Sequence, residues 1–150
     1  MTIIMTTTTA ERVLAIAGRW IGTPYRHQGA AEGIGCDCLG LVRGIWRELY
    51  GAEPEPVPPY AMDWAARSGD ERLEAAARRH FRPLAHLREA VPGDLLLFRF
   101  RPDQLARHAG ILATDGYFIH AYEQAGVIRS ALVQGFVRRI AGCYRVTEVS

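Results

Sequence analysis

The sequence of 150 residues contains no lysine, so all 18 of its basic residues are arginines, and it contains only three cysteines. No apolar run approaches the ~18 residues that a membrane span requires, and the net charge is only +2. These absences exclude a membrane span, a small scaffold held by disulfides, and binding of nucleic acid through a basic arm. Residues 1–9 lack the basic and apolar regions of a secretory signal, so we expect synthesis in the cytoplasm without a signal peptide.

The composition is typical of one soluble globular domain. Apolar residues make up 49% of the chain and charged residues 23%, which are near the averages for such domains. Helical patterns dominate the first half of the chain and strand patterns the second. This order predicts a single α+β domain over residues 1–150. Four prolines within residues 53–59 exclude regular structure there, and two short helices separated at Ser68-Gly69 are predicted to follow.

Two amphipathic helices are predicted in the first third of the chain. Thr8 and Glu11 have the spacing of a capping box, which starts the first helix, and Gly22-Thr-Pro24 ends it. The second helix begins within residues 37–38 and ends before Gly51, which suits the left-handed position after a helix. The apolar stripes that the helices would bury are Val13, Leu14, Ala17, Trp20 and Ile21 in the first, and Leu39, Val42, Ile45, Trp46 and Leu49 in the second.

Strand patterns begin after Pro92-Gly93 and predict strands over residues 94–100, 108–113, 117–122, 126–130 and 143–146. The second and third of these are joined by Thr114-Asp115-Gly116, which fits a type I turn closed by a glycine with positive φ. This three-residue connection would place His120 opposite Gly110, on the same sheet face as His108. A two-residue Asp115-Gly116 turn would instead place the two histidines on opposite faces.

Cys38 is the leading candidate for a reactive side chain. It lies in the first turn of a predicted helix, where free amide donors and the helix dipole favour a thiolate, which is the nucleophilic form of cysteine. Gly35 and Gly40 on either side would allow a substrate backbone to approach closely. The alternative is a buried structural thiol. Asp37, which precedes Cys38, can instead serve as an ordinary helix N-cap.

A nucleophilic cysteine needs a base, and histidine is the usual one. The predicted hairpin permits a relay of Cys38, His108 and His120, with His108 as the base and His120 as the residue that orients it. Taken alone, each histidine has the alternative of a purely structural role. A zinc site formed by Cys36, Cys38, His108 and His120 is a further alternative, which the unusual Cys-x-Cys spacing disfavours.

Five short motifs follow one another along the chain: Gly22-Thr-Pro-Tyr25, Gly35-Cys-Asp-Cys-Leu-Gly-Leu-Val42, Pro92-Gly-Asp-Leu95, Arg107-His-Ala-Gly-Ile111 and Phe118-Ile-His-Ala121. Their order and spacing, from about Ala10 to the C-terminus, resemble the NlpC/P60 cysteine peptidases. The second motif, together with Trp46-Arg-Glu-Leu-Tyr-Gly51, is most similar to the phage-type branch. That branch is found in tailed phages and in phage-like gene transfer agents.

The resemblance implies a papain-like α+β fold in which the helix of the nucleophile packs on an antiparallel sheet. It implies that Cys38 is the nucleophile, His108 the base and His120 the third polar residue. Tyr25 and Asp37 match residues that contact substrate. The implied reaction is hydrolysis of amide bonds in peptidoglycan stem peptides, commonly between γ-D-glutamate and a diamino acid, with no metal or cofactor.

The phage-type branch implies a particular setting and leaves alternatives open. The expected partners are tail-tip or baseplate hub proteins of a virion-like particle, and the expected place of action is the periplasm of a target cell. Two alternatives are an N-acetylmuramoyl-L-alanine amidase of the same fold and a catalytically silent tail protein. The chain departs from the family in having Leu39 where serine usually follows the nucleophile. Residues 53–88 also exceed a minimal family core, and we treat them as a structural insert.

Overall fold

The structure, a computed structural model, describes residues 8–56 and 72–147. Its elements are α1 (Thr9–Trp20), β1 (Ala30–Ala31), β2 (Gly35–Cys36), α2 (Cys38–Tyr50), α4 (Arg72–His80), β3 (Phe81–Pro83), the 3-10 helix η1 (Leu87–Glu89), β4 (Leu95–Phe98), β5 (His108–Leu112), β6 (Tyr117–Tyr122), β7 (Gly126–Ala131), α5 (Gln134–Val137) and β8 (Ile140–Val146). The two long helices precede the strands of the antiparallel main sheet, so the predicted α+β class is confirmed. No helix within the described ranges is both long and apolar enough to span a bilayer.

The caps of the two long helices are those that the sequence predicts. The Thr8 hydroxyl accepts a hydrogen bond from the amide of Glu11 at 3.1 Å, which satisfies one of the free donors of α1. At the C-terminal end of α2, Gly51 takes a φ of 86° and donates its amide to the carbonyl of Arg47. Glycine suits this position because its φ is in the left-handed region, which other residues rarely adopt.

The main sheet has six antiparallel strands in the order β3-β8-β4-β5-β6-β7. All five strands that the sequence predicts are present, with bounds that differ by a few residues. Strand β3 is not predicted, and it pairs with β8 from Phe81 opposite Val146 to Pro83 opposite Tyr144. Part of the segment expected to be an insert is therefore an edge strand of the sheet. The predicted helix break at Ser68-Gly69 lies outside the described residues.

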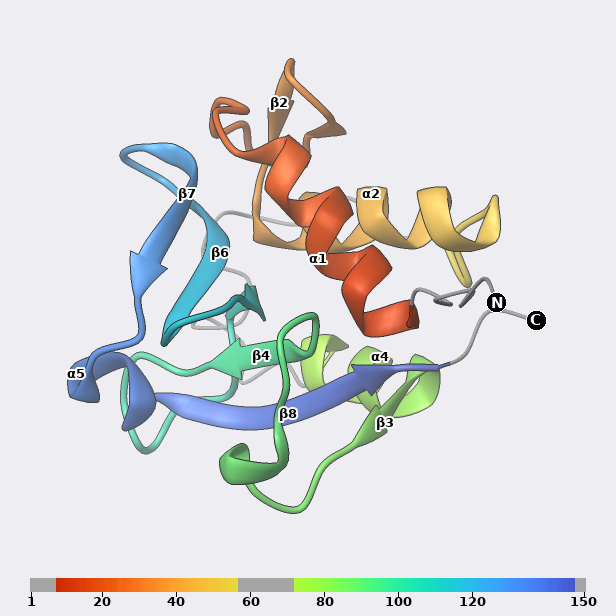
Figure 1. Ribbon diagram of the computed structural model, residues 1–150. Helices are drawn as coiled ribbons and strands as arrows, with labels where there is room; N and C mark the ends of the chain where they lie inside the picture. The colour runs from red at the N-terminus through yellow and green to blue at the C-terminus, as the bar shows by residue number, and fades with distance from the viewer. Residues whose placement is uncertain (1–7, 57–71, 148–150) are drawn as a thin grey trace, which may run out of the picture.

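The two faces of the sheet are buried in different ways. Helices α1 and α2 pack against each other and over one face (Figure 1), where α2 contacts β5 and β6 and α1 contacts β8. The opposite face carries a smaller cluster of Leu96, Phe98, Phe118 and Cys143, against which Phe136 of α5 packs. Burial on both faces explains why β4 consists of four consecutive buried residues rather than an alternating pattern.

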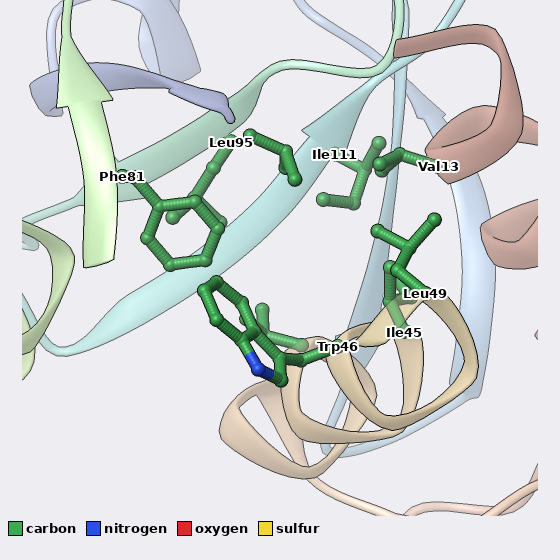
Figure 2. Close-up of a pocket in the computed structure, with 9 residues that line it drawn as sticks. Val13, Ile45, Trp46, Leu49, Phe81, Leu95 and Ile111 are labelled. Carbon is green, nitrogen blue, oxygen red and sulfur yellow. The ribbon is translucent and has the colours of Figure 1, made fainter. Parts of the chain in front are cut away.

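The contact between α2 and the sheet is filled by hydrocarbon. Figure 2 shows Ile45, Trp46 and Leu49 of α2 pointing toward Leu95 and Ile111 of the sheet, with side chains of α1 and β3 beside them. The cavity that remains among these apolar residues measures about 10 Å³. It is a small packing gap in the core and has no polar groups that would hold a water molecule. This packed contact fixes the distance between α2 and the sheet, and it thereby fixes the position of Cys38.

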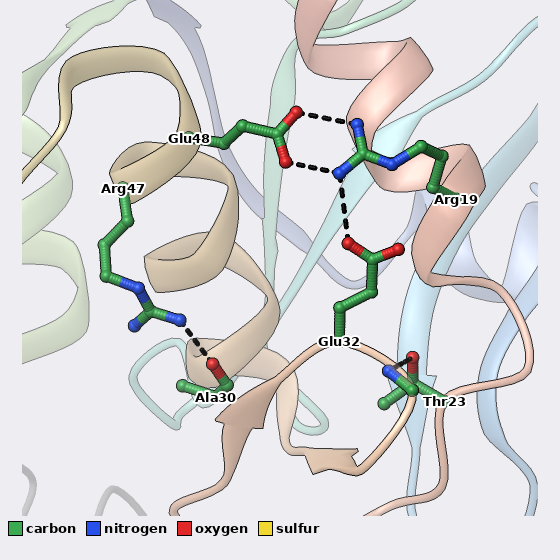
Figure 3. Close-up of polar contacts among 7 residues, drawn as sticks. Arg19, Thr23, Ala30, Glu32, Arg47 and Glu48 are labelled. Atoms are coloured by element: carbon green, nitrogen blue, oxygen red, sulfur yellow. Dashed lines mark hydrogen bonds and ion pairs between the residues drawn. The ribbon is translucent and has the colours of Figure 1, made fainter.

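Arginine side chains tie the β1–β2 hairpin to the helices. Arg19 of α1 bonds to Glu48 of α2 and, at 3.0 Å, to Glu32 of the hairpin (Figure 3). Arg47 of α2 donates to the carbonyl of Ala30 in β1. The groups around Arg19 are about half exposed, so each pair alone contributes little to stability. Together they orient the hairpin that leads directly into the first turn of α2.

Candidate active site

Cys38 is the first residue of α2, immediately after the N-cap Asp37. Its thiol accepts hydrogen bonds from the backbone amides of Leu39 and Ala109. The first of these donors belongs to the start of α2, where amides have no partner within the helix. The second belongs to β5, so the sulfur lies beside the backbone of the residue that follows His108. The contact between α2 and β5 thus places the predicted nucleophile against the strand that begins with the predicted base.

Asp37 occupies a structural position beneath the thiol. Its side chain is almost fully buried, at 3% exposed. One carboxylate oxygen accepts the amide of Gly40 at 2.8 Å, and the other accepts the amide of Gln28 at 2.7 Å. The carboxylate therefore caps α2 and holds the preceding loop against it, which is the N-cap alternative for this residue. The structure gives Asp37 a role in positioning Cys38, while contact with substrate stays a prediction.

The hairpin of β5 and β6 has the register that the sequence predicts. Ile111 pairs with Ile119 and Leu112 with Phe118, so His120 lies opposite Gly110. A Cβ on Gly110 would stand 3.3 Å from that of His120 and 2.9 Å from the ring of Phe118, so glycine leaves the room that His120 needs. Nε2 of His108 and Nδ1 of His120 are 2.8 Å apart, which is hydrogen-bond distance.

The turn that sets this register differs from the predicted one. Asp115 and Gly116 both have positive φ, at 59° and 77°, and the amide of Tyr117 donates to the carbonyl of Thr114 at 3.2 Å. Two central residues with positive φ characterise a type I′ turn rather than type I. The register is nevertheless that of a three-residue connection, because the amide of Ala113 bonds to the carbonyl of Tyr117 and leaves Thr114 as an extra residue.

Ser130 extends the histidine pair into a chain of three residues, and the sequence analysis did not identify it. Its hydroxyl lies 2.8 Å from Nε2 of His120. The pairing of β6 with β7 places Ser130 opposite Phe118, one diagonal step from His120 on the neighbouring strand. The same diagonal relation that links His108 and His120 across the first hairpin thus links His120 and Ser130 across the second.

One direction of donation along these bonds leaves Nδ1 of His108 free to act as a base. His108 can accept a proton from the thiol on Nδ1 only in the tautomer that carries hydrogen on Nε2. That hydrogen is then donated to Nδ1 of His120. The hydrogen of His120 in turn resides on Nε2 and is donated to the hydroxyl oxygen of Ser130. The hydroxyl of Ser130 can accept this hydrogen, so its position is compatible with the tautomer of His108 that a base requires.

Burial keeps the thiol and both imidazoles neutral. It raises the pKa of Cys38 to about 12, with a smaller effect from the carboxylate of Asp37. It lowers the pKa of His108 to about 3, aided by His120 and Arg107, and it lowers the pKa of His120 to about 4. Charged forms are disfavoured in such surroundings because they lose their hydration. At neutral pH the site therefore pairs a thiol with a neutral imidazole, and the proton must move when sulfur attacks.

Tyr25 lies at the rim of this arrangement and is half-buried. It forms an isolated bridge with Cys36, the residue two positions before the thiol. Burial is the largest cause that raises the pKa of its phenol above the usual value, and the negative charges that Cys38 and Asp37 can carry are the next largest. The hydroxyl is therefore protonated at neutral pH and available as a hydrogen-bond donor near the sulfur.

The remaining cysteines and the zinc alternative can be considered together. Cys36, Cys38 and Cys143 are all free thiols. Cys36 is fully buried in the main core, and His120 directs both ring nitrogens to other side chains. Neither residue is thus placed to bind an ion. Within residues 8–56 and 72–147, no group of three or more histidine, cysteine or acidic residues is arranged to hold a metal.

Comparison with known proteins places this geometry in a family. The profile of the NlpC/P60 family matches residues 22–145. "Probable endopeptidase NlpC" of Escherichia coli K12 is 32% identical over 130 residues, which cover 82% of this chain and 72% of that protein. "Murein DD-endopeptidase MepS/Murein LD-carboxypeptidase" of the same organism is 27% identical over 86% of this chain, and the match spans 58% of its length. The solved structure of NlpC2 from Trichomonas vaginalis has the same fold, with a TM-score of 0.70 and 17% identity over 95% of this chain and 49% of that one. This chain belongs to the NlpC/P60 family.

Proposed function

We propose that the protein is a cysteine peptidase that hydrolyses amide bonds in the stem peptides of peptidoglycan. The observation that carries the proposal is the hydrogen-bonded chain of His108, His120 and Ser130, together with a thiol at the start of a helix that accepts the amide of Ala109, the residue after His108. The relative named as a murein DD-endopeptidase supports peptidoglycan as the substrate. The bond that we expect to be cleaved joins γ-D-glutamate to a diamino acid.

The mechanism is acyl transfer through a thioester. Nδ1 of His108 takes the proton of the Cys38 thiol as sulfur attacks the amide carbonyl carbon. The negative charge that develops on the carbonyl oxygen is stabilised by the Cys38 amide and the Tyr25 hydroxyl. The C–N bond then breaks, and His108 gives its proton to the departing amine. Water, deprotonated by His108, attacks the thioester, which releases the carboxylic acid and restores the thiol.

The first test is digestion of purified diaminopimelate-type muropeptides, with products identified by mass spectrometry. Wild-type protein is expected to cleave after γ-D-glutamate, and Cys38→Ala is expected to give no product, because no nucleophile remains. Circular dichroism of the variant provides the control for folding. Release of the intact stem peptide from muramic acid would instead assign the protein as an amidase. A folded wild type that cleaves neither bond would contradict the proposal.

The setting that we propose is a phage-like particle in which the protein is bound to tail-tip or baseplate hub proteins. The support is the similarity of residues 35–51 to the phage-type branch of the family. In this setting the enzyme opens the wall locally, from the periplasm of the target cell, during delivery of DNA. Mass spectrometry of purified particles is expected to detect the chain together with hub proteins. Its absence from particles, while it is present in the producing cells, would overturn this setting.

Ser130 gives a test of the tautomer argument. Ser130→Ala is expected to lower kcat about fivefold with little change in KM, because the hydrogen of His120 loses an acceptor worth roughly 1 kcal/mol. Ser130→Thr keeps a hydroxyl and is expected to restore most of the activity. Nitrogen NMR of the imidazoles should show a mixture of His120 tautomers in Ser130→Ala alone. An unchanged tautomer and unchanged kcat would show that Ser130 has no positioning role.

A further inference from the structure

The imidazole of His108 lies against two phenyl rings. Phe98 of β4 is paired with His108 across the sheet, and their ring centroids are 5.9 Å apart. The ring of Phe100, two residues further along the chain, has its centroid 6.2 Å from that of the imidazole, and the two planes are inclined by only 25°. Such a near-parallel arrangement is a stacked contact, in which one flat ring covers part of the other. Phe100 thus covers part of the proposed base.

Phe100 contributes less to the core than Phe98 does. Phe98 is 1% exposed and belongs to the smaller apolar cluster, whereas Phe100 is 41% exposed and belongs to neither apolar cluster of the described residues. Its ring contacts are with His108 and with Arg107, whose guanidinium lies 4.6 Å from the ring centroid. A guanidinium over an aromatic ring is attracted to it and restrains both side chains. The contacts of Phe100 are therefore with the candidate site rather than with the core.

The connection between β4 and β5, which carries Phe100, is held in place by hydrogen bonds. The amide of Arg107 donates to the carbonyl of Phe98 at 2.9 Å, which closes the connection at its base. The amide of Ala106 donates to the carboxylate of Glu74 in α4 at 3.3 Å. Helix α4 belongs to the segment that we expected to be a structural insert. This helix therefore helps to hold the connection that places Phe100 against His108.

The surroundings of His108 leave two tasks for a stacked ring. The hydrogen bond to His120 fixes the direction of one nitrogen but not the plane of the imidazole. The charged or titratable groups around His108 are His120 on β6, Arg107 before it in the chain, and the thiol of Cys38 on α2, which lies beside the next residue. None of them is negative while the thiol is protonated, so water is the group that would stabilise an imidazolium.

We propose that Phe100 is a positioning residue for His108, whose ring holds the imidazole in one plane and keeps water from it. This inference rests on the proposed function, in which His108 is the base. An imidazole held in one plane keeps Nε2 directed to His120 and leaves Nδ1 for the proton of the thiol. An imidazole without water beside it stays neutral, which is the form that a base requires. Phe100 therefore acts on kcat and on the pH dependence of the reaction.

Titration of the His108 imidazole by NMR, in the protein without substrate, tests the exclusion of water even if the protein cleaves no peptidoglycan. Phe100→Ala is expected to raise the pKa of His108 from about 3 toward the usual value of about 6.5. Phe100→Leu remains large and apolar, and Phe100→Tyr keeps the ring, so both should keep this pKa low. Tyr122→Ala is the matched control, because Tyr122 is 44% exposed and its ring lies 5.9 Å from that of His120. It should leave the pKa of His108 unchanged. The same pKa in Phe100→Ala as in wild type would overturn the proposal.

Kinetics on diaminopimelate-type muropeptides test the orientation of the imidazole. At pH 8, Phe100→Ala and Phe100→Leu are expected to lower kcat by about 2- to 10-fold with little change in KM, the loss expected for one aromatic contact. Phe100→Tyr should restore kcat. The ratio of kcat/KM at pH 8 to that at pH 5.5 is expected to stay near 1 in wild type and to rise to about 2–10 in Phe100→Ala alone, because a base with a raised pKa is partly protonated at pH 5.5. Equal losses in all three variants at both pH values, with lowered thermal stability, would assign Phe100 to folding and overturn the proposal.

Discussion

Replacing His108 by glutamine is expected to lower kcat/KM by about 10³- to 10⁴-fold, the range expected when a general base is removed. The loss is large because burial raises the pKa of the Cys38 thiol to about 12, so almost no thiolate exists at neutral pH without a base. Glutamine is similar in length to histidine and can still bond to His120, so the variant should remain folded. Steady-state kinetics on diaminopimelate-type muropeptides, with thermal unfolding measured alongside, provide the test.

The pH profile distinguishes loss of a base from general damage. In wild type, activity should fall only at pH values well below the usual range of histidine, because His108 must gain a proton before it fails as a base and its pKa is lowered to about 3. In His108→Gln, the residual activity should instead rise with pH, since only hydroxide can then deprotonate the thiol. A flat profile for the variant, or an acidic limb near pH 6.5 for wild type, would contradict this account.

His120 provides the matched comparison for His108. His120→Asn can place its amide oxygen near the position of Nδ1 and accept the hydrogen of His108, so it is expected to retain activity within about tenfold of wild type. His120→Leu has no acceptor and should lose considerably more. Equal losses in these two variants would show that His120 contributes packing alone.

Gly40→Ala is expected to lower the free energy of unfolding by about 3 kcal/mol, at the upper end of the range for overpacked sites. A Cβ at this position would overlap the carbonyl oxygen of Gly29 and lie 2.8 Å from the carbonyl carbon. Both obstacles are backbone, so the loop before β1 must move away from α2. That movement strains the bonds from Asp37 to Gly40 and Gln28, and it displaces Cys38 within the same helical turn. Urea denaturation and kcat should both report the damage.

Gly18→Ala is the control for this substitution. Gly18 also lies within a helix, but a Cβ there would have no neighbour within 4 Å. Alanine is expected to stabilise α1 by about 0.5–1 kcal/mol, because it restricts the unfolded chain more than glycine does. A destabilisation by Gly40→Ala no greater than 0.5 kcal/mol would show that the loop can yield, contrary to the close approach described above.

The sequence predicted the parts of the site that depend on local patterns. Spacing alone placed the caps of the two helices and the start of the helix at Cys38. The connection at residues 114–116 correctly placed His120 on the same face as His108, although the turn itself is of type I′. Of the two connections compared, only the three-residue one puts both histidines on one side of the sheet, and the structure has its register.

Other features of the site and the sheet depend on long-range contacts, which local sequence patterns do not predict. Ser130 is reached only across a second hairpin, and Phe100 reaches His108 from the connection after β4. The edge strand β3 is three residues long, contains Pro83, and follows a helical pattern, so it carries no strand signal of its own. For Asp37 the sequence left two roles open, and the structure assigns the capping role through both carboxylate oxygens.

The position of β8 between β3 and β4 has a consequence for synthesis on the ribosome. The nucleophile is translated in the first third of the chain, but β3 has no pairing partner, and β4 lacks one of its two neighbours, until residues 140–146 emerge. Pairings between strands that are far apart in the sequence form late, because the intervening chain must be present before they can form. A ribosome-bound fragment that stops before Ile140 therefore holds the thiol without a completed sheet beneath it. The candidate site is therefore completed only after β8 has emerged.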